Sequence, residues 1–107
     1  MQSRHRGKTY PMAALLGCAM LYSAIVQAAD PAHGARVFQA QCAKCHGSDG
    51  APTMPGVPDF SRGAPLMKSD IELLKFIRRG RGIMPAYQGL LTDNDILDAI
   101  SYLRTLR

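Results

Sequence analysis

The amino-acid sequence predicts a small all-α domain. Two segments, residues 69–80 and 92–106, carry apolar side chains at helical spacing, and a third helix is expected after Asp30. No segment shows the alternation of apolar and polar residues that is typical of a half-buried β-strand, and no internal repeat is present. We therefore expect three main helices in one domain, with a long irregular segment between the first helix and the second.

The first helix is predicted from the Asp30-Pro31 pair. Aspartate is a favoured N-cap residue, and proline is tolerated in the first turn because its missing N–H has no partner there. Val37 and Phe38 give this helix an apolar side. We expect the helix to run into Cys42.

The segment from Gly47 to Lys68 is predicted to be irregular. It holds four prolines and four glycines in 22 residues. Proline removes a backbone donor and clashes with the preceding turn, so this density excludes a regular helix.

The second helix has signals at both ends. Ser69 and Glu72, in "SDIE", form a capping box that satisfies backbone donors at the helix start. Gly80 follows the last turn, where the positive charges of Arg78 and Arg79 complement the helix dipole. The helix is therefore expected between Ser69 and Gly80.

The third helix is predicted to begin near Thr92. Asp93 and Asp95 suit the positive N-terminal end of a helix. The residues that form its apolar stripe are Ile96, Ala99, Ile100, Leu103 and Leu106.

The N-terminal region predicts export. A basic start, an apolar run and small residues at its end form the pattern of a secretory signal peptide, with cleavage after Ala28. Residues 1–28 are thus a predicted signal peptide, and residues 29–107 the working domain. Two alternatives stay open: an uncleaved membrane anchor, and lipidation at Cys18 within "LLGC".

Charge and cysteine content change when this leader is removed. Loss of Arg4, Arg6 and Lys8 leaves ten basic against eight acidic residues, a net charge near +2. Nucleic acid is a poor partner, because a basic stripe with interleaved aromatic residues is missing. Only Cys42 and Cys45 then remain of the three cysteines.

These two cysteines lie in "CAKCH", directly before His46. A redox dithiol of the thioredoxin type needs a βαβ context, which the sequence lacks. A structural zinc site needs four ligands, and the exported chain offers only the two cysteines, His46 and His33. The remaining interpretation is covalent attachment of a c-type haem: the two thiols, three residues apart on a helical turn, each add to a vinyl group, and His46 is the proximal ligand of the iron.

The whole exported domain resembles the class I monohaem cytochromes c. Their first helix carries a glycine and an aromatic residue at fixed distances before the haem cysteines, as Gly34 and Phe38 do in "GARVFQAQC". Their last helix places an aromatic residue against that glycine, which matches Tyr102. The resemblance implies a small cytochrome c fold, in which three main helices and the Pro/Gly-rich loop surround one covalently bound haem.

The resemblance also implies two further site residues. The family has a proline twelve positions after the haem histidine whose carbonyl accepts the imidazole N–H, and this count leads from His46 to Pro58. The family's methionine ligand lies shortly before the last helix, which matches Met84 in "GRGIMPAYQGL".

Three other residues are candidates for the sixth iron ligand. Met54 lies in the loop expected on the proximal side, His33 in the first helical turn, and Met67 just before the second helix. Each is more often a packing or surface residue than a ligand. The same holds for Met84 taken alone, so Met84 is the expected ligand because of its glycine- and proline-flanked frame and the resemblance, and Met67 stays open as an alternative.

His/Met ligation leaves no open coordination position and raises the reduction potential of the iron, which suits one-electron transfer. The sequence therefore predicts a periplasmic bacterial electron carrier with one haem c, not an enzyme. Two alternatives stay open: a dedicated cytochrome subunit of a periplasmic dehydrogenase or reductase, and a ligand-binding haem sensor or peroxidase-like protein. The expected partners are redox proteins that dock at Arg78, Arg79 and Arg81, with membrane association only if the leader is retained or Cys18 is lipidated.

Overall fold

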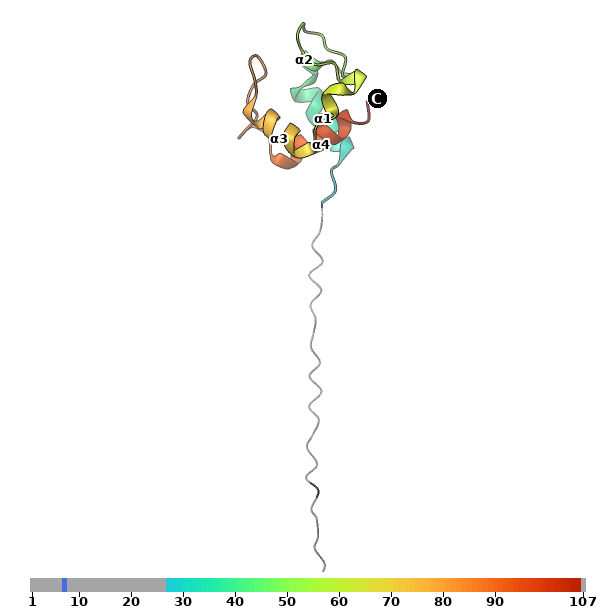
Figure 1. Ribbon diagram of the computed structural model, residues 1–107, viewed down its shortest axis with the longest axis vertical. Helices are drawn as coiled ribbons and strands as arrows, with labels where there is room; N and C mark the ends of the chain where they lie inside the picture. The colour runs from blue at the N-terminus through green and yellow to red at the C-terminus, as the bar shows by residue number, and fades with distance from the viewer. Residues whose placement is uncertain (1–6, 8–26, 107) are drawn as a thin grey trace, which may run out of the picture.

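The computed structural model describes residue 7 and residues 27–106, and Figure 1 shows how the helices of this part of the chain are arranged. The described residues contain isolated β-bridges but no β-strand, so the all-α class is confirmed. The predicted signal peptide, including Cys18, lies outside the described residues except for residues 7, 27 and 28. The elements are α1 (Pro31–Gln41), α2 (Ala43–His46), the 3-10 turns η1 (Phe60–Arg62) and η2 (Ala64–Leu66), α3 (Asp70–Arg79) and α4 (Asp93–Leu103).

Helix α1 begins as predicted. The Asp30 carboxylate accepts hydrogen bonds from the backbone N–H groups of Ala32 and His33, at 2.9 and 3.1 Å. The helix ends at Gln41, and Cys42 is its C-cap. The chain then forms α2, a single turn that we did not predict as a separate element.

Helices α3 and α4 both begin with a capping box. Ser69 and Glu72 form the predicted capping box of α3, and Gly80 caps its C-terminal end. Helix α4 has an unpredicted second capping box, in which Thr92 and Asp95 exchange side-chain and backbone hydrogen bonds. The buried residues of α4 are four of the five predicted for its apolar stripe, Ile96, Ala99, Ile100 and Leu103, whereas Leu106 lies beyond the end of the helix and is partly buried.

Helices α1 and α4 cross at Gly34. A Cβ atom at this position would lie 1.9 Å from the carbonyl oxygen of Asp98 and 2.8 Å from the backbone nitrogen of Ala99. The predicted role of Gly34 is thus correct, but its neighbour is the α4 backbone, not an aromatic ring. Tyr102 instead packs on Phe38, with ring centroids 5.6 Å apart and an angle of 52° between the planes.

The core consists of two adjoining apolar clusters. The first contains Leu74, Tyr87, Ile96 and Ile100, and the second contains Phe38, Leu66 and Leu103. Arg104 holds the segment before α3 over the second cluster by donating hydrogen bonds to the carbonyl oxygens of Leu66 and Lys68, at 2.6 and 3.0 Å.

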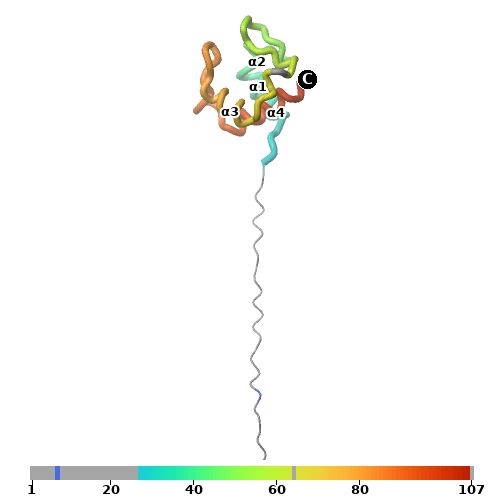
Figure 2. Tube along the Cα trace, viewed as in Figure 1, coloured from blue at the N-terminus to red at the C-terminus, as the bar shows by residue number. Residues whose placement is uncertain are grey.

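Two long connections extend from this core. Figure 2 shows that the segment after α2, drawn in green, and the segment after α3, drawn in orange, both reach toward the end of the domain away from the start of α1. None of the helices found in residues 27–106 has the length and apolar character to cross a membrane.

Candidate haem site

The two cysteines flank one helical turn. The carbonyl oxygen of Cys42 accepts hydrogen bonds from the backbone N–H groups of Cys45 and His46, at 3.2 and 3.0 Å. This spacing directs the side chains of Cys42 and Cys45 to the same side of the turn. Neither described cysteine is in a disulfide, and both are partly buried. The turn therefore offers two neighbouring thiols beside an imidazole.

The imidazole of His46 is buried, with 9 % of the residue exposed. Its ring stacks on Phe60, with ring centroids 4.6 Å apart and the planes inclined by 22°. Burial lowers the pKa of His46, and the backbone of Pro58 acts in the opposite direction. The Nδ1 atom nevertheless has no partner at hydrogen-bond geometry. A buried imidazole can bind a metal through one ring nitrogen while the other faces a backbone carbonyl, and the Pro58 backbone lies beside this ring.

Met84 lies in the orange segment after α3. Two hydrogen bonds close its turn: Arg81 N–H to the carbonyl oxygen of Met84, at 3.1 Å, and Met84 N–H to that of Arg81, at 3.0 Å. Gly80 and Gly82 on this turn have φ values of 65° and 57°, which favour glycine. The Met84 side chain is partly buried against the first apolar cluster. The Met84 side chain thus packs toward the core, although most residues of this loop are exposed.

Tyr87 joins the Met84 segment to the cysteine-bearing turn. Its hydroxyl donates a hydrogen bond of 2.7 Å to the carbonyl oxygen of Gln41, the residue before Cys42. The pKa of Tyr87 is raised, first by burial and then by its proximity to Cys42 and Cys45. Sequence reasoning missed Tyr87, as it missed Phe60. For Tyr87, the available signal was an aromatic residue with a hydrogen-bonding group in a loop that contains several glycines and a proline.

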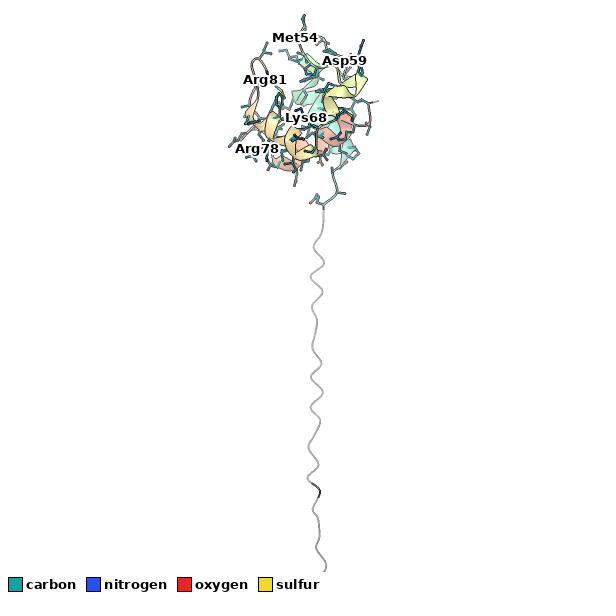
Figure 3. The ribbon with its side chains drawn as sticks, viewed as in Figure 1. Met54, Asp59, Lys68, Arg78 and Arg81 are labelled. Atoms are coloured by element: carbon teal, nitrogen blue, oxygen red, sulfur yellow. The ribbon has the colours of Figure 1, made fainter. Side chains whose placement is uncertain are left out.

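Of the other candidate ligands, Met54 is partly buried like Met84, whereas Met67 and His33 are less suited to the site. Met67 is 80 % exposed. The His33 ring is hydrogen-bonded to the Asp95 carboxylate, at 2.9 Å between Nε2 and Oδ1. Figure 3 shows Met54 on the loop that follows α2, on a different segment from Arg81.

The donor atoms present fit a covalently held haem better than a bare metal ion. Among the described residues, no three His, Cys, Asp or Glu side chains come together as a metal site. The nearest such set, the two cysteines and His46, is short of the four ligands of a structural zinc site. Two unpaired thiols, a buried imidazole and a partly buried thioether are, in contrast, the groups that attach and ligate a c-type haem.

Comparison with known proteins decides the family. Residues 29–103 match the family model described as "Cytochrome C oxidase, cbb3-type, subunit III". The chain is 31 % identical over 91 residues to cytochrome c6 of Porphyra purpurea, with 80 % of each chain covered. It is 35 % identical over 78 residues to cytochrome c6 of Leptolyngbya boryana, with 70 % of this chain and 91 % of the relative covered. This chain belongs to the class I monohaem cytochrome c family.

Membership confirms several predictions. The cytochrome is an electron-transfer protein that carries one covalently bound c-type haem, and it is not an enzyme. The helical architecture agrees with the small cytochrome c fold.

Proposed function

We propose that this cytochrome is a periplasmic one-electron carrier whose haem is attached through Cys42 and Cys45 and ligated by His46 and Met84. The observation that carries the proposal is the 2.7 Å hydrogen bond from Tyr87 to the residue before Cys42. Because Met84 is three residues from Tyr87, this bond ties the Met84 segment to the residue before Cys42, which supports the assignment of Met84 to the same site. A haem bound there would supply reversible one-electron chemistry.

Each protein group has a distinct task. The thiols of Cys42 and Cys45 hold the group covalently, and His46 donates a ring nitrogen to the iron. The backbone of Pro58, next to that ring, is suited to orient it. Met84 would be the second protein ligand of the iron, which would exclude exogenous ligands and raise the reduction potential.

Covalent attachment is tested with the intact mass of the exported protein. We expect a mass that matches residues 29–107 plus one haem, and we expect Cys42→Ala combined with Cys45→Ala to abolish covalent haem. Haem staining after denaturing electrophoresis reports the loss. Retention of covalent haem in the double variant would refute the assignment.

The same mass measurement tests localisation. The leader pattern of residues 1–28 supports export to the bacterial periplasm, with cleavage after Ala28. A retained leader would indicate an anchored protein, and acyl chains on Cys18 a lipoprotein. Either mass would overturn the prediction of a cleaved carrier.

Axial ligation is tested with methionine variants. The ferric wild type is expected to show the far-red sulfur-to-iron charge-transfer band, and Met84→Ala is expected to lose it, to lower the potential and to bind added ligands. Met67→Ala is the matched control, because that side chain is exposed. A band that survives Met84→Ala and disappears in Met67→Ala would identify the other methionine as the ligand.

We further propose that Arg79 and Arg81 dock an acidic redox partner, with Arg78 in a secondary role. Arg79 and Arg81 are exposed, whereas Arg78 forms an ion pair with Asp93, at 3.2 Å. Figure 3 shows Arg78 and Arg81 on the same side of the domain, and Ile83 nearby in the chain is 76 % exposed. An apolar side chain among unneutralised cations suits a transient interface whose association rate depends on charge.

Docking is tested by charge reversal. Arg79→Glu and Arg81→Glu are expected to slow association with an acidic redox partner, and added salt is expected to slow the wild type. Arg62→Glu is the control for charge reversal elsewhere on the surface, because the Arg62 side chain is exposed and lies on η1, where it forms an ion pair with Asp59 at 3.2 Å. Rates that respond to neither salt nor the Arg79 and Arg81 changes would reject this surface.

A second candidate is supported by the description of the family model, which names a subunit of an oxidase. The cytochrome would then be a dedicated electron-transfer subunit of a larger enzyme. Stoichiometric co-purification with one enzyme at physiological salt would favour this candidate over a freely diffusing carrier.

A further inference from the structure

Tyr87 is held from several sides. Only 7 % of the residue is exposed, and its ring is part of the first apolar cluster. Its backbone N–H donates to the carbonyl oxygen of Ile77, at 3.2 Å, and its own carbonyl oxygen accepts from Leu90 and Leu91, at 3.0 and 3.1 Å. The residue is therefore a fixed point of the otherwise exposed loop between α3 and α4.

The acceptor of its hydroxyl is a helix-end carbonyl. Gln41 is the last residue of α1, and the final carbonyl groups of a helix have no donor within the helix. The Tyr87 hydroxyl supplies one donor from a residue 46 positions away in the sequence. The hydrogen bond is partly buried, although Gln41 as a residue is exposed, and removal of the hydroxyl leaves the Gln41 carbonyl without this donor.

The short distance along the chain makes this contact relevant to Met84. Three residues span at most about 10 Å, and Pro85 stiffens this stretch. A shift of Tyr87 relative to Gln41 therefore displaces Met84 relative to the neighbouring Cys42. Among the hydrogen bonds of the described residues, this is the one that links the Met84 segment to the cysteine-bearing turn.

We propose that the Tyr87 hydroxyl is a positioning group that holds Met84 at the iron by anchoring its loop to the carbonyl of Gln41. The proposal rests on the proposed function, because it requires Met84 to be the axial ligand. Tyr87 touches neither iron nor partner in this role. It acts by setting the fraction of molecules in which the thioether is bound.

The test compares Tyr87→Phe with Tyr102→Phe in the haem-loaded protein. Both changes remove one hydroxyl from an aromatic residue, but no hydrogen bond of the described residues involves the Tyr102 hydroxyl, so that variant is the matched control. Imidazole binding to the ferric protein measures the population with an open axial position, because only that population binds it. We expect Tyr87→Phe to bind imidazole about tenfold more tightly than the wild type, which corresponds to the loss of one hydrogen bond.

A purely structural role would lower the unfolding temperature without this selective change. We therefore also expect the charge-transfer band of Tyr87→Phe to disappear on heating well before its far-UV circular dichroism changes, and Tyr102→Phe to behave as wild type in both measurements. Wild-type imidazole affinity in Tyr87→Phe would overturn the proposal.

Failure of the proposed function gives a different result. A wild type without the charge-transfer band, or a band that depends on Met67, refutes Met84 ligation and this proposal together. A wild-type band lost in Met84→Ala, together with wild-type imidazole affinity and wild-type heating behaviour in Tyr87→Phe, refutes this proposal alone. If Tyr87→Phe does not accumulate, the hydroxyl proton of Tyr87 in the wild type decides. Slow exchange with water supports the bond to Gln41, and exchange at the rate of a free tyrosine overturns it.

Discussion

Replacement of Gly34 by alanine tests the crossing of α1 and α4. The added Cβ atom would lie 1.9 Å from the carbonyl oxygen of Asp98, whereas ordinary contacts begin near 3.4 Å. The two helix backbones must therefore separate by about 1.5 Å, because neither atom is the end of a flexible side chain. This separation loosens the packing of Phe38 and Ile100, which are both almost completely buried.

The magnitude follows from two opposing effects. Overpacking of this kind costs about 3 kcal/mol, and exchange of glycine for alanine within a helix recovers about 1 kcal/mol. The free energy of unfolding should fall by about 2 kcal/mol, which lowers the midpoint of thermal unfolding by about 8 °C or more.

The assay is denaturant unfolding of the haem-loaded protein, followed by far-UV circular dichroism and extrapolated to water. Ala40→Gly, at an exposed position of α1, reports the effect of helix propensity alone and should cost about 1 kcal/mol. The sign of the change in the free energy of unfolding is decisive. If Gly34→Ala is as stable as the wild type or more stable, the close crossing of the two backbones is refuted.

Two further predictions concern a carboxylate and a pair of glycines. The pKa of Asp95 is lowered to about 2, chiefly by a hydrogen bond from the Thr92 hydroxyl. The ionised carboxylate should therefore stabilise the fold fully above about pH 4, and this stabilisation should be lost as the pH falls through about 2. Asp95→Asn should remove that part of the acid-unfolding curve. Gly80→Ala should weaken the charge-transfer band, because a Cβ atom there would lie 2.6 Å from the Met84 carbonyl oxygen. Gly82 is the control: it has a similar positive φ, but a Cβ atom there would meet no atom within 4 Å. Gly82→Ala should therefore add backbone strain and leave the band intact. An unchanged acid limb in Asp95→Asn, or equal loss of the band in both glycine variants, would contradict these predictions.

The sequence alone determined the features that depend on near neighbours. The capping box of Ser69 and Glu72 joins residues three positions apart, and the Asp30 cap acts within the same distance, so these helix starts could be predicted from residue type and spacing. The proximity of Cys42 and Cys45 could be predicted for the same reason, because a single turn brings them together, and their attachment of the haem stays a prediction. Family resemblance added the glycine at position 34.

Only the tertiary structure decided which distant groups meet. Gly34 contacts the backbone at Asp98, the imidazole of His46 lies on Phe60, and the Tyr87 hydroxyl reaches Gln41. None of these contacts follows from periodicity, because helical spacing specifies the face on which a side chain lies but not the residue that packs against it. The partner depends on how closely two helices approach and on the path of a loop rich in glycine and proline, and many long-range contacts settle both together.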